Sequence, residues 1–147
     1  MSDTKASGKN SNMIISRSSR DGSASFNATE VSEKFTGGAV WVDTVLAAEG
    51  ILVHNVNFAP GARSFWHWHE KGQVLRVTAG CGWLCDRGAK PVRINVGDVI
   101  WCPSSTEHWH GADDQSYMVH QAVSLGSVRF MEEVSDDTYQ AKTDSKA

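Results

Sequence analysis

Cysteine and proline are scarce in this chain of 147 residues, which contains three of each. The cysteines are Cys81, Cys85 and Cys102, an odd number with no CxxC spacing. Small secreted domains held together by disulfides carry even sets of cysteines, and CxxC pairs are typical of structural zinc sites. We therefore expect three free thiols and no disulfide framework.

The chain also lacks a strong excess of charge and a long apolar run. Its formal net charge is −3, and no stretch approaches the roughly 20 apolar residues needed to span a bilayer. Residues 1–12 are polar and lack the apolar core of a secretory signal. These absences argue against nucleic-acid and membrane partners and predict a cytoplasmic protein.

A hydrophobic fraction of 40%, with six tryptophans, is enough for one buried core in a chain of this length. Small polar residues dominate both ends. We expect a disordered polar arm over 1–12, one folded domain over 13–134 and a polar C-terminal tail over 135–147.

Short β-rich segments separated by glycine and proline fill the expected domain. About nine strands at such close spacing predict an all-β antiparallel sandwich or barrel. The one helix candidate is short, over 28–34. The expected strands cover 39–46, 51–58, 64–69, 73–78, 83–85, 92–96, 99–102, 108–110 and 117–124, and an edge strand is expected at 14–15 beside them.

Six histidines lie between positions 54 and 120, and four of them form the pairs His67-Trp68-His69 and His108-Trp109-His110. On a strand, residues i and i+2 point to the same face, so each pair aims two imidazoles at one side of a sheet. Several imidazoles on one inner face predict a metal site, because buried rings otherwise need separate hydrogen-bond partners. Trp66, Trp68 and Trp109 then face away, into core packing or a dimer interface.

Two spaced motifs give this pattern a family resemblance. Residues 61–80 read GARSFWHWHEKGQVLRVTAG and keep every spacing of the first cupin motif, G(X)5HXH(X)3–4E(X)6G. Residues 97–112 read GDVIWCPSSTEHWHGA and resemble the second motif, G(X)5PXG(X)2H(X)3N. The resemblance implies a single-domain cupin, a jelly-roll-like antiparallel β-barrel. Three positions depart from the general pattern, with Gln73 replacing the usual Glu, Ser105 a Gly and Ala112 an Asn.

The chain further resembles the bacterial manganese-dependent hydroxynitrile lyases among the small cupins, through FTGG at 35–38, WVD at 41–43 and the H-x-H-x-x-x-Q pattern. This resemblance implies that Mn(II) is the metal, with Fe(II), Ni(II), Co(II) or Zn(II) as alternatives, and a cyanohydrin as substrate. The implied ligands are His67, His69, Gln73 and His108, and the implied active-site histidine is His120.

His54 is a second candidate base or cyanide-stabilising group, because it shares a strand face with Leu52, Val56 and Phe58. An outward or rim position is the other interpretation of His54. His110 has the same parity as His108, but we place it beside the ligands or at the barrel mouth, and not among them.

Gln73 changes the chemistry expected of such a site. A glutamate ligand would neutralise one of the two charges of the ion, whereas an amide neutralises none. The ion is therefore a stronger Lewis acid toward an anionic oxygen. The other interpretation of Gln73 is an inward amide that hydrogen-bonds a neighbour without binding metal.

Other functions stay open at this point. The same site suits a cupin dioxygenase that cleaves a small aromatic or dicarbonyl substrate, or an isomerase or decarboxylase tailoring enzyme without a further cofactor. A sensor or storage cupin is a non-enzymatic alternative, although this chain has no room for a DNA-binding domain. We expect a small-molecule substrate and a homodimer or higher homo-oligomer, since small cupins commonly pair.

Overall fold

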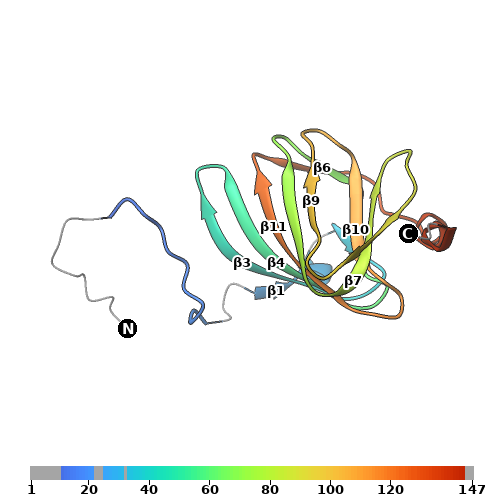
Figure 1. The fold of residues 1–147 in the computed structure, drawn as a ribbon, viewed down its shortest axis with the longest axis horizontal. Helices are drawn as coiled ribbons and strands as arrows, with labels where there is room; N and C mark the ends of the chain where they lie inside the picture. Colours follow the sequence, from blue (N-terminus) through green and yellow to red (C-terminus); the bar gives the residue numbers. More distant parts are fainter. Residues whose placement is uncertain (1–10, 22–24, 32, 145–147) are drawn as a thin grey trace.

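The computed structural model describes residues 11–21, 25–31 and 33–144, and it is built almost entirely of strands (Figure 1). The expected polar arm over 1–12 falls largely outside these residues. Every predicted strand except the edge strand at 14–15 overlaps a strand of the structure, but the one expected over 64–69 is split in two, and those expected over 73–78 and 83–85 are a single strand. The strands are β1 Ser25–Asn27, β2 Phe35–Thr36, β3 Val40–Ala48, β4 Ile51–Phe58, β5 Arg63–Ser64, β6 His67–His69, β7 Gln73–Asp86, β8 Val92–Asn95, β9 Val99–Cys102, β10 His108–Ala112, β11 Met118–Leu125 and β12 Val128–Phe130.

All strand pairs are antiparallel, and they curl into a barrel in the order β1-β3-β4-β11-β7-β10-β5-β2. Strand β7 joins the two halves of the barrel. Its first half pairs with β11 and β9, and its second half pairs with β10 and β8. The all-β prediction is thus confirmed.

Two glycines allow β7 to run unbroken through a region that we expected to be a corner between two strands. A Cβ on Gly80 would lie 1.9 Å from the carbonyl oxygen of Tyr117, and one on Gly82 would lie 2.0 Å from that of Gly111. No larger residue fits where the neighbouring backbones come this close. The strand therefore bends from one half of the barrel into the other without ending.

Hydrophobic side chains fill the closed end of the barrel and one outer flank. Val40, Val56, Phe58, Val77 and Met118 belong to the inner cluster and are at most 5% exposed. The flank cluster lies between β10 and the C-terminal segment. It contains Trp66, Trp83, Cys85, Trp109, Val134 and Tyr139.

Residues 136–144 of the expected polar tail are helical in the structure. Helix α2, Asp136–Gln140, is capped by the Ser135 side chain and continues as a 3-10 turn, Ala141–Asp144. Tyr139 anchors it, because this ring packs on Trp109 and its hydroxyl donates to the Ala112 carbonyl over 2.6 Å. A helix this short needs these tertiary contacts in addition to its local cap.

Two further local predictions need correction. Residues 14 and 15 form no strand, and the described residues place no neighbouring strand beside them. The helix expected over 28–34 is shorter, α1 Ala28–Val31, because the chain turns into β2 at Phe35. No helix in the described part of the chain has the length and hydrophobicity of a membrane span.

Candidate metal centre

Strands β6, β7 and β10 bring the four predicted ligands to one place inside the barrel. Residues His67 and His69 lie on β6, Gln73 begins β7, and His108 on β10 pairs directly with His67. The ring centre of His67 lies 4.4 Å from that of His108 and 5.3 Å from that of His69. All four side chains are at most 5% exposed.

Backbone carbonyls orient two of these imidazoles. The Nδ1 atom of His67 lies 2.9 Å from the Phe65 carbonyl, and Nδ1 of His108 lies 2.8 Å from the Thr106 carbonyl. A carbonyl can only accept, so both Nδ1 atoms carry the proton. The Nε2 lone pairs are then free for a metal, the orientation that metal-binding histidines commonly have.

The amide of Gln73 is oriented in the same way, by a hydrogen bond from its Nε2 to Ser124 Oγ over 3.0 Å. Its Oε1 then lies 3.3 Å from Nε2 of His108. Since that nitrogen carries no proton, two acceptors face each other with no donor between them. Neither ring nitrogen of the buried His69 has a partner. A cation bound here would satisfy all of these atoms.

His110, which sequence reasoning set aside as a ligand, also reaches this cluster. Ring nitrogens of His67, His108 and His110 lie within 4.8 Å of one another, and His69 is outside that group. His110 also contacts His120, whose Nε2 lies 3.0 Å from Nδ1 of His110. The signal in the sequence was the shared parity of His108 and His110 on one strand.

Burial keeps these histidines uncharged. Desolvation, together with the neighbouring His108, lowers the pKa of His69 to about 4. Desolvation also lowers the pKa of His120 to about 4, and it holds the pKa values of His67 and His110 well below the ordinary 6.5. Neutral imidazole is the form that binds metal and accepts protons, so the cluster is ready for both at neutral pH.

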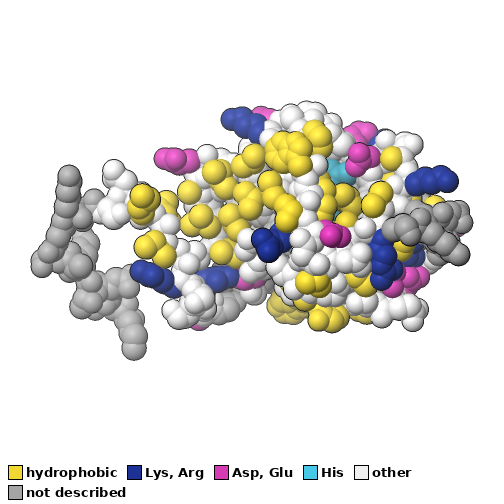
Figure 2. All heavy atoms as spheres, viewed as in Figure 1, with side chains coloured by type: hydrophobic (Ala, Val, Ile, Leu, Met, Phe, Trp, Pro, Cys, Tyr) yellow, Lys and Arg dark blue, Asp and Glu magenta, His cyan; other side chains and the backbone are white. Residues whose placement is uncertain are grey.

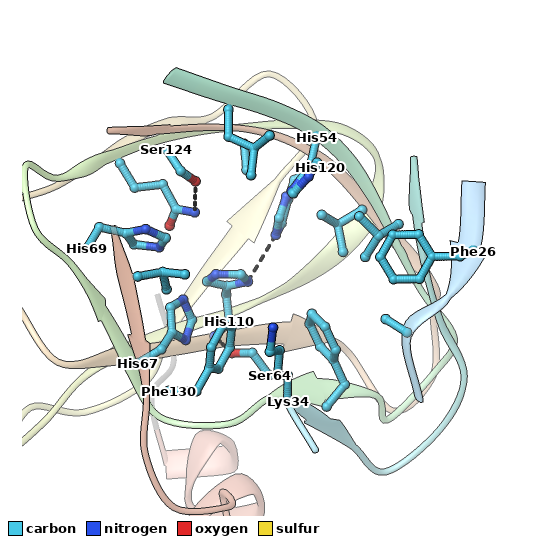
Figure 3. Close-up of a pocket in the computed structure, with 18 of the residues that line it drawn as sticks. Phe26, Lys34, His54, Ser64, His67, His69, His110, His120, Ser124 and Phe130 are labelled. Carbon is cyan, nitrogen blue, oxygen red and sulfur yellow. Dashed lines mark hydrogen bonds between the residues drawn. The ribbon is translucent and has the colours of Figure 1, made fainter. Parts of the chain in front are cut away.

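One side of a cavity of about 400 Å³ is lined by His67, His69, Gln73 and His110 of the cluster (Figure 3). Its other walls are mainly hydrophobic, and the described residues that line it include no aspartate or glutamate. Lys34 supplies the one ammonium group among them, 5.2 Å from the centre of the Phe130 ring. The remaining walls come from Phe26, Ala28, Phe35, Val42, Leu52, Val56, Ala122, Gly126, Val128 and Phe130.

Both predicted active-site histidines line this cavity, from the neighbouring strands β4 and β11 (Figure 3). His120 is fully buried beside His110. His54 is half-buried, and burial lowers its pKa although Asp43 opposes that shift. The inward position of His54 replaces the rim position that the sequence left open.

Comparison with known proteins identifies the family of this fold. The family described as "Cupin domain" matches residues 54–121. A curated relative, the (R)-mandelonitrile lyase of Granulicella tundricola, is 43% identical over 110 residues, which cover 70% of this chain and 84% of that protein. The chain belongs to the cupin family. The resemblance read from the two motifs is thus confirmed.

Solved cupin structures share the fold. A cupin-like protein of Thermotoga maritima superposes with a TM-score of 0.74 at 36% identity, covering 78% of this chain and 92% of that one. A polyketide cyclase of Streptomyces resistomycificus superposes with a TM-score of 0.66 at 14% identity, covering 88% and 97% of the two chains. At this low identity, the similarity to the cyclase is evidence of a shared fold and not of a shared function.

The donor set fits a divalent metal ion. It consists of neutral imidazoles and an amide oxygen, which suit first-row transition metals. Their unpartnered acceptor atoms face one another in a buried space. This cupin therefore carries a three-histidine group compatible with a divalent metal, next to a cavity large enough for a small molecule.

Proposed function

We propose that this cupin is a metal-dependent hydroxynitrile lyase, which splits a cyanohydrin into an aldehyde and hydrogen cyanide. The observation that carries the proposal is a metal-type donor cluster without any carboxylate, opening onto a hydrophobic cavity that also holds a pair of neutral histidines. The 43% identical mandelonitrile lyase supports the same reaction. Mn(II) is the proposed ion, with His67, His69, Gln73 and His108 as its ligands.

The bound ion supplies Lewis acidity, which lowers the pKa of a nearby hydroxyl. Because Gln73 is a neutral ligand, the protein leaves both charges of the ion uncompensated. The hydrophobic walls of the cavity receive the organic part of the cyanohydrin. Phe35, Val42 and Phe130 suit an aromatic ring such as that of mandelonitrile.

The pair His110 and His120 takes up the proton. With a proton on its Nδ1, His110 donates to Nε2 of His120 and keeps a lone pair on its own Nε2, which has no partner. That lone pair accepts the hydroxyl proton of the substrate. The carbon–carbon electron pair then leaves with cyanide, the carbonyl forms, and the histidine returns the proton to give hydrogen cyanide.

In this proposal, Lys34 and His54 stabilise the departing cyanide. Cyanide departs as an anion into a hydrophobic space, where a positive charge stabilises it more than in water. Lys34 provides that charge, and no carboxylate among the described lining residues competes for it. His54 lines the same cavity from β4, and in this proposal it donates a hydrogen bond to the nitrile nitrogen.

The decisive experiment measures cyanide released from mandelonitrile by the manganese-loaded protein, together with metal content by elemental analysis. We expect Gln73→Ala to lose metal and activity together. Gln73→Glu is the matched control, because it restores an oxygen ligand. It should keep the metal but lose at least about tenfold in kcat, since its charge weakens the Lewis acid.

A substitution in the proton-accepting histidine pair separates the role of that pair from the role of the metal ligands. We expect His120→Asn to keep the metal and to lose cyanide release by a factor of about 10² or more. Cyanide release no faster than in a blank without enzyme would refute the lyase while leaving the metal cupin intact. Oxygen consumption with a candidate aromatic or dicarbonyl substrate, lost with the metal, would favour the dioxygenase instead.

A further inference from the structure

Ser124 lines the cavity from β11, directly across from Gln73 on β7 (Figure 3). Both side chains are buried, with 8% and 4% of their surface exposed. Paired residues of an antiparallel sheet have Cβ atoms about 5 Å apart, so a short hydroxyl side chain reaches the amide of its neighbour. The hydrogen bond from Gln73 Nε2 to Ser124 Oγ, 3.0 Å long, is the result.

The direction of this hydrogen bond determines what Ser124 does with its own proton. An amide nitrogen can only donate, so Oγ of Ser124 is the acceptor. A hydroxyl group also carries one proton to donate, and no acceptor for it is found among the described residues. Ser124 is buried with the histidine cluster, little of which reaches the face shown in Figure 2. The partner of this proton is therefore a molecule that occupies the cavity.

The opposite orientation of the Gln73 amide would have a different effect on Ser124. With its two ends exchanged, the amide would accept from the Ser124 hydroxyl and donate to Nε2 of His108, which carries no proton. All three groups would then be satisfied without a cation, and Gln73 would hold the Ser124 proton. The orientation that presents Oε1 to the ligand cluster is thus the one that leaves the Ser124 proton free.

A glutamate in place of Gln73 would remove this freedom. An ionised carboxylate can only accept, so the Ser124 hydroxyl would donate to it in either orientation. The proton would then be unavailable to a molecule in the cavity. The amide of Gln73, which replaces the Glu of the general cupin pattern, therefore affects the neighbouring serine as well as the charge of the site.

A series of short contacts places Ser124 and the proton-accepting His110 around one cluster. Ser124 Oγ lies 3.0 Å from the amide nitrogen of Gln73, and Oε1 of that amide lies 3.3 Å from Nε2 of His108. Ring nitrogens of His108 and His110 lie within 4.8 Å of each other. A substrate oxygen beside this cluster has a proton acceptor on one side and the Ser124 donor on the other.

We propose that Ser124 is a substrate-binding residue, which accepts a hydrogen bond from Gln73 and donates its own proton to a substrate oxygen beside the ligand cluster. This inference rests on the proposed function. In a cyanohydrin that oxygen is the hydroxyl, which becomes the carbonyl oxygen of the aldehyde as the carbon–carbon bond breaks. A donor at this position stabilises the negative charge that develops on the oxygen before cyanide leaves.

The first test measures the Mn(II) dissociation constant from the electron paramagnetic resonance signal of the free ion. We expect Ser124→Ala to raise this constant about tenfold, because the amide N–H loses its acceptor and no longer holds Oε1 toward the cluster. Ser124→Thr keeps the hydroxyl and should bind the ion as the native protein does. In the Gln73→Glu background, Ser124→Ala should change the constant less than about threefold, since a carboxylate has no N–H to satisfy.

The second test measures donation into the cavity, with Mn(II) at a saturating concentration. Benzaldehyde, the aldehyde that mandelonitrile cleavage yields, is the probe, and calorimetry gives its dissociation constant. We expect Ser124→Ala to raise that constant about fivefold or more in the native background. In the Gln73→Glu background it should have little effect, because the carboxylate already holds the proton.

The same variants have a kinetic readout. At saturating Mn(II), Ser124→Ala should lower kcat for cyanide release by at least about tenfold, and Ser124→Thr should keep most of the native kcat. Ser116→Ala is the control, because Ser116 is a serine outside the cavity lining. It should change neither the two dissociation constants nor kcat.

The outcomes distinguish this inference from the proposed lyase. A native protein that releases no cyanide, but whose affinity for benzaldehyde depends on Ser124 only in the native background, would refute the lyase and support the role of Ser124. Equal effects of Ser124→Ala in the two backgrounds would overturn the inference, because Ser124 would then act independently of the Gln73 amide. Benzaldehyde affinity unchanged by Ser124→Ala in the native background would also overturn it, whether or not cyanide is released.

Discussion

At the scale of the residue, the chain departs from the cupin pattern at Gln73, Ser105 and Ala112, and the structure gives the first two departures a physical meaning. Gln73 joins the buried donor cluster through an amide oriented by Ser124. Ser105 takes the left-handed backbone conformation that its glycine counterpart would adopt freely, with φ at 60°. A serine there bears a steric cost that a glycine avoids.

We therefore predict that Ser105→Gly stabilises the protein by about 0.5–1 kcal/mol, the strain of a non-glycine residue less the added chain entropy of glycine. The midpoint of urea unfolding measures the change. Ser116→Gly is the comparison, because Ser116 has no positive φ and its replacement should destabilise slightly. An unchanged midpoint in Ser105→Gly would show that the turn is unstrained.

At the scale of the element, strand β10 carries His108 and His110 and is held from outside by the C-terminal segment. The Tyr139 hydroxyl donates to the carbonyl of Ala112, at the end of β10. Buried Arg63 donates to the carbonyl of Val134 and to the Asp136 carboxylate. The segment that the sequence suggested was a tail thus covers the strand that supplies two of the clustered histidines.

Truncation after Val134 should therefore destabilise the fold by several kcal/mol, because it removes the Tyr139 ring that covers buried Trp109 and the carboxylate of Asp136 that pairs with buried Arg63. Tyr139→Phe, which removes only the hydroxyl, should cost about 1 kcal/mol. Thermal unfolding compares the two. A truncated protein with the full-length melting temperature would mean that the helix contributes nothing to stability.

At the scale of the whole molecule, the barrel encloses a group of uncharged histidines, and this makes its stability depend on pH. The pKa of His120 is about 4 in the folded protein, against an ordinary 6.5 in the unfolded chain. Below pH 6.5 the unfolded chain binds protons that the folded state cannot. Stability is therefore complete above pH 6.5 and falls as the pH drops toward 4.

We predict a loss of stability in acid for the chelator-treated protein. Its free energy of unfolding should fall by on the order of 1 kcal/mol per pH unit for each fully buried histidine between pH 6.5 and 4. Denaturant titrations at pH 7.5 and pH 5 measure this loss. His120→Asn should reduce the slope, because it removes one of the groups concerned. Equal stability at the two pH values would mean that the histidines titrate normally in the fold.

The sequence by itself determined the barrel and the position of the metal-type residues, since both follow from short-range patterns. Strand alternation aims His67 and His69 the same way, and the two motif spacings identify the cupin family. Only the tertiary structure joined His110 to His67 and His108, brought His120 to His110, and packed residues 136–144 against β10. Those contacts join residues far apart in the chain, or residues whose side-chain direction depends on the closure of the barrel, and no local pattern encodes them.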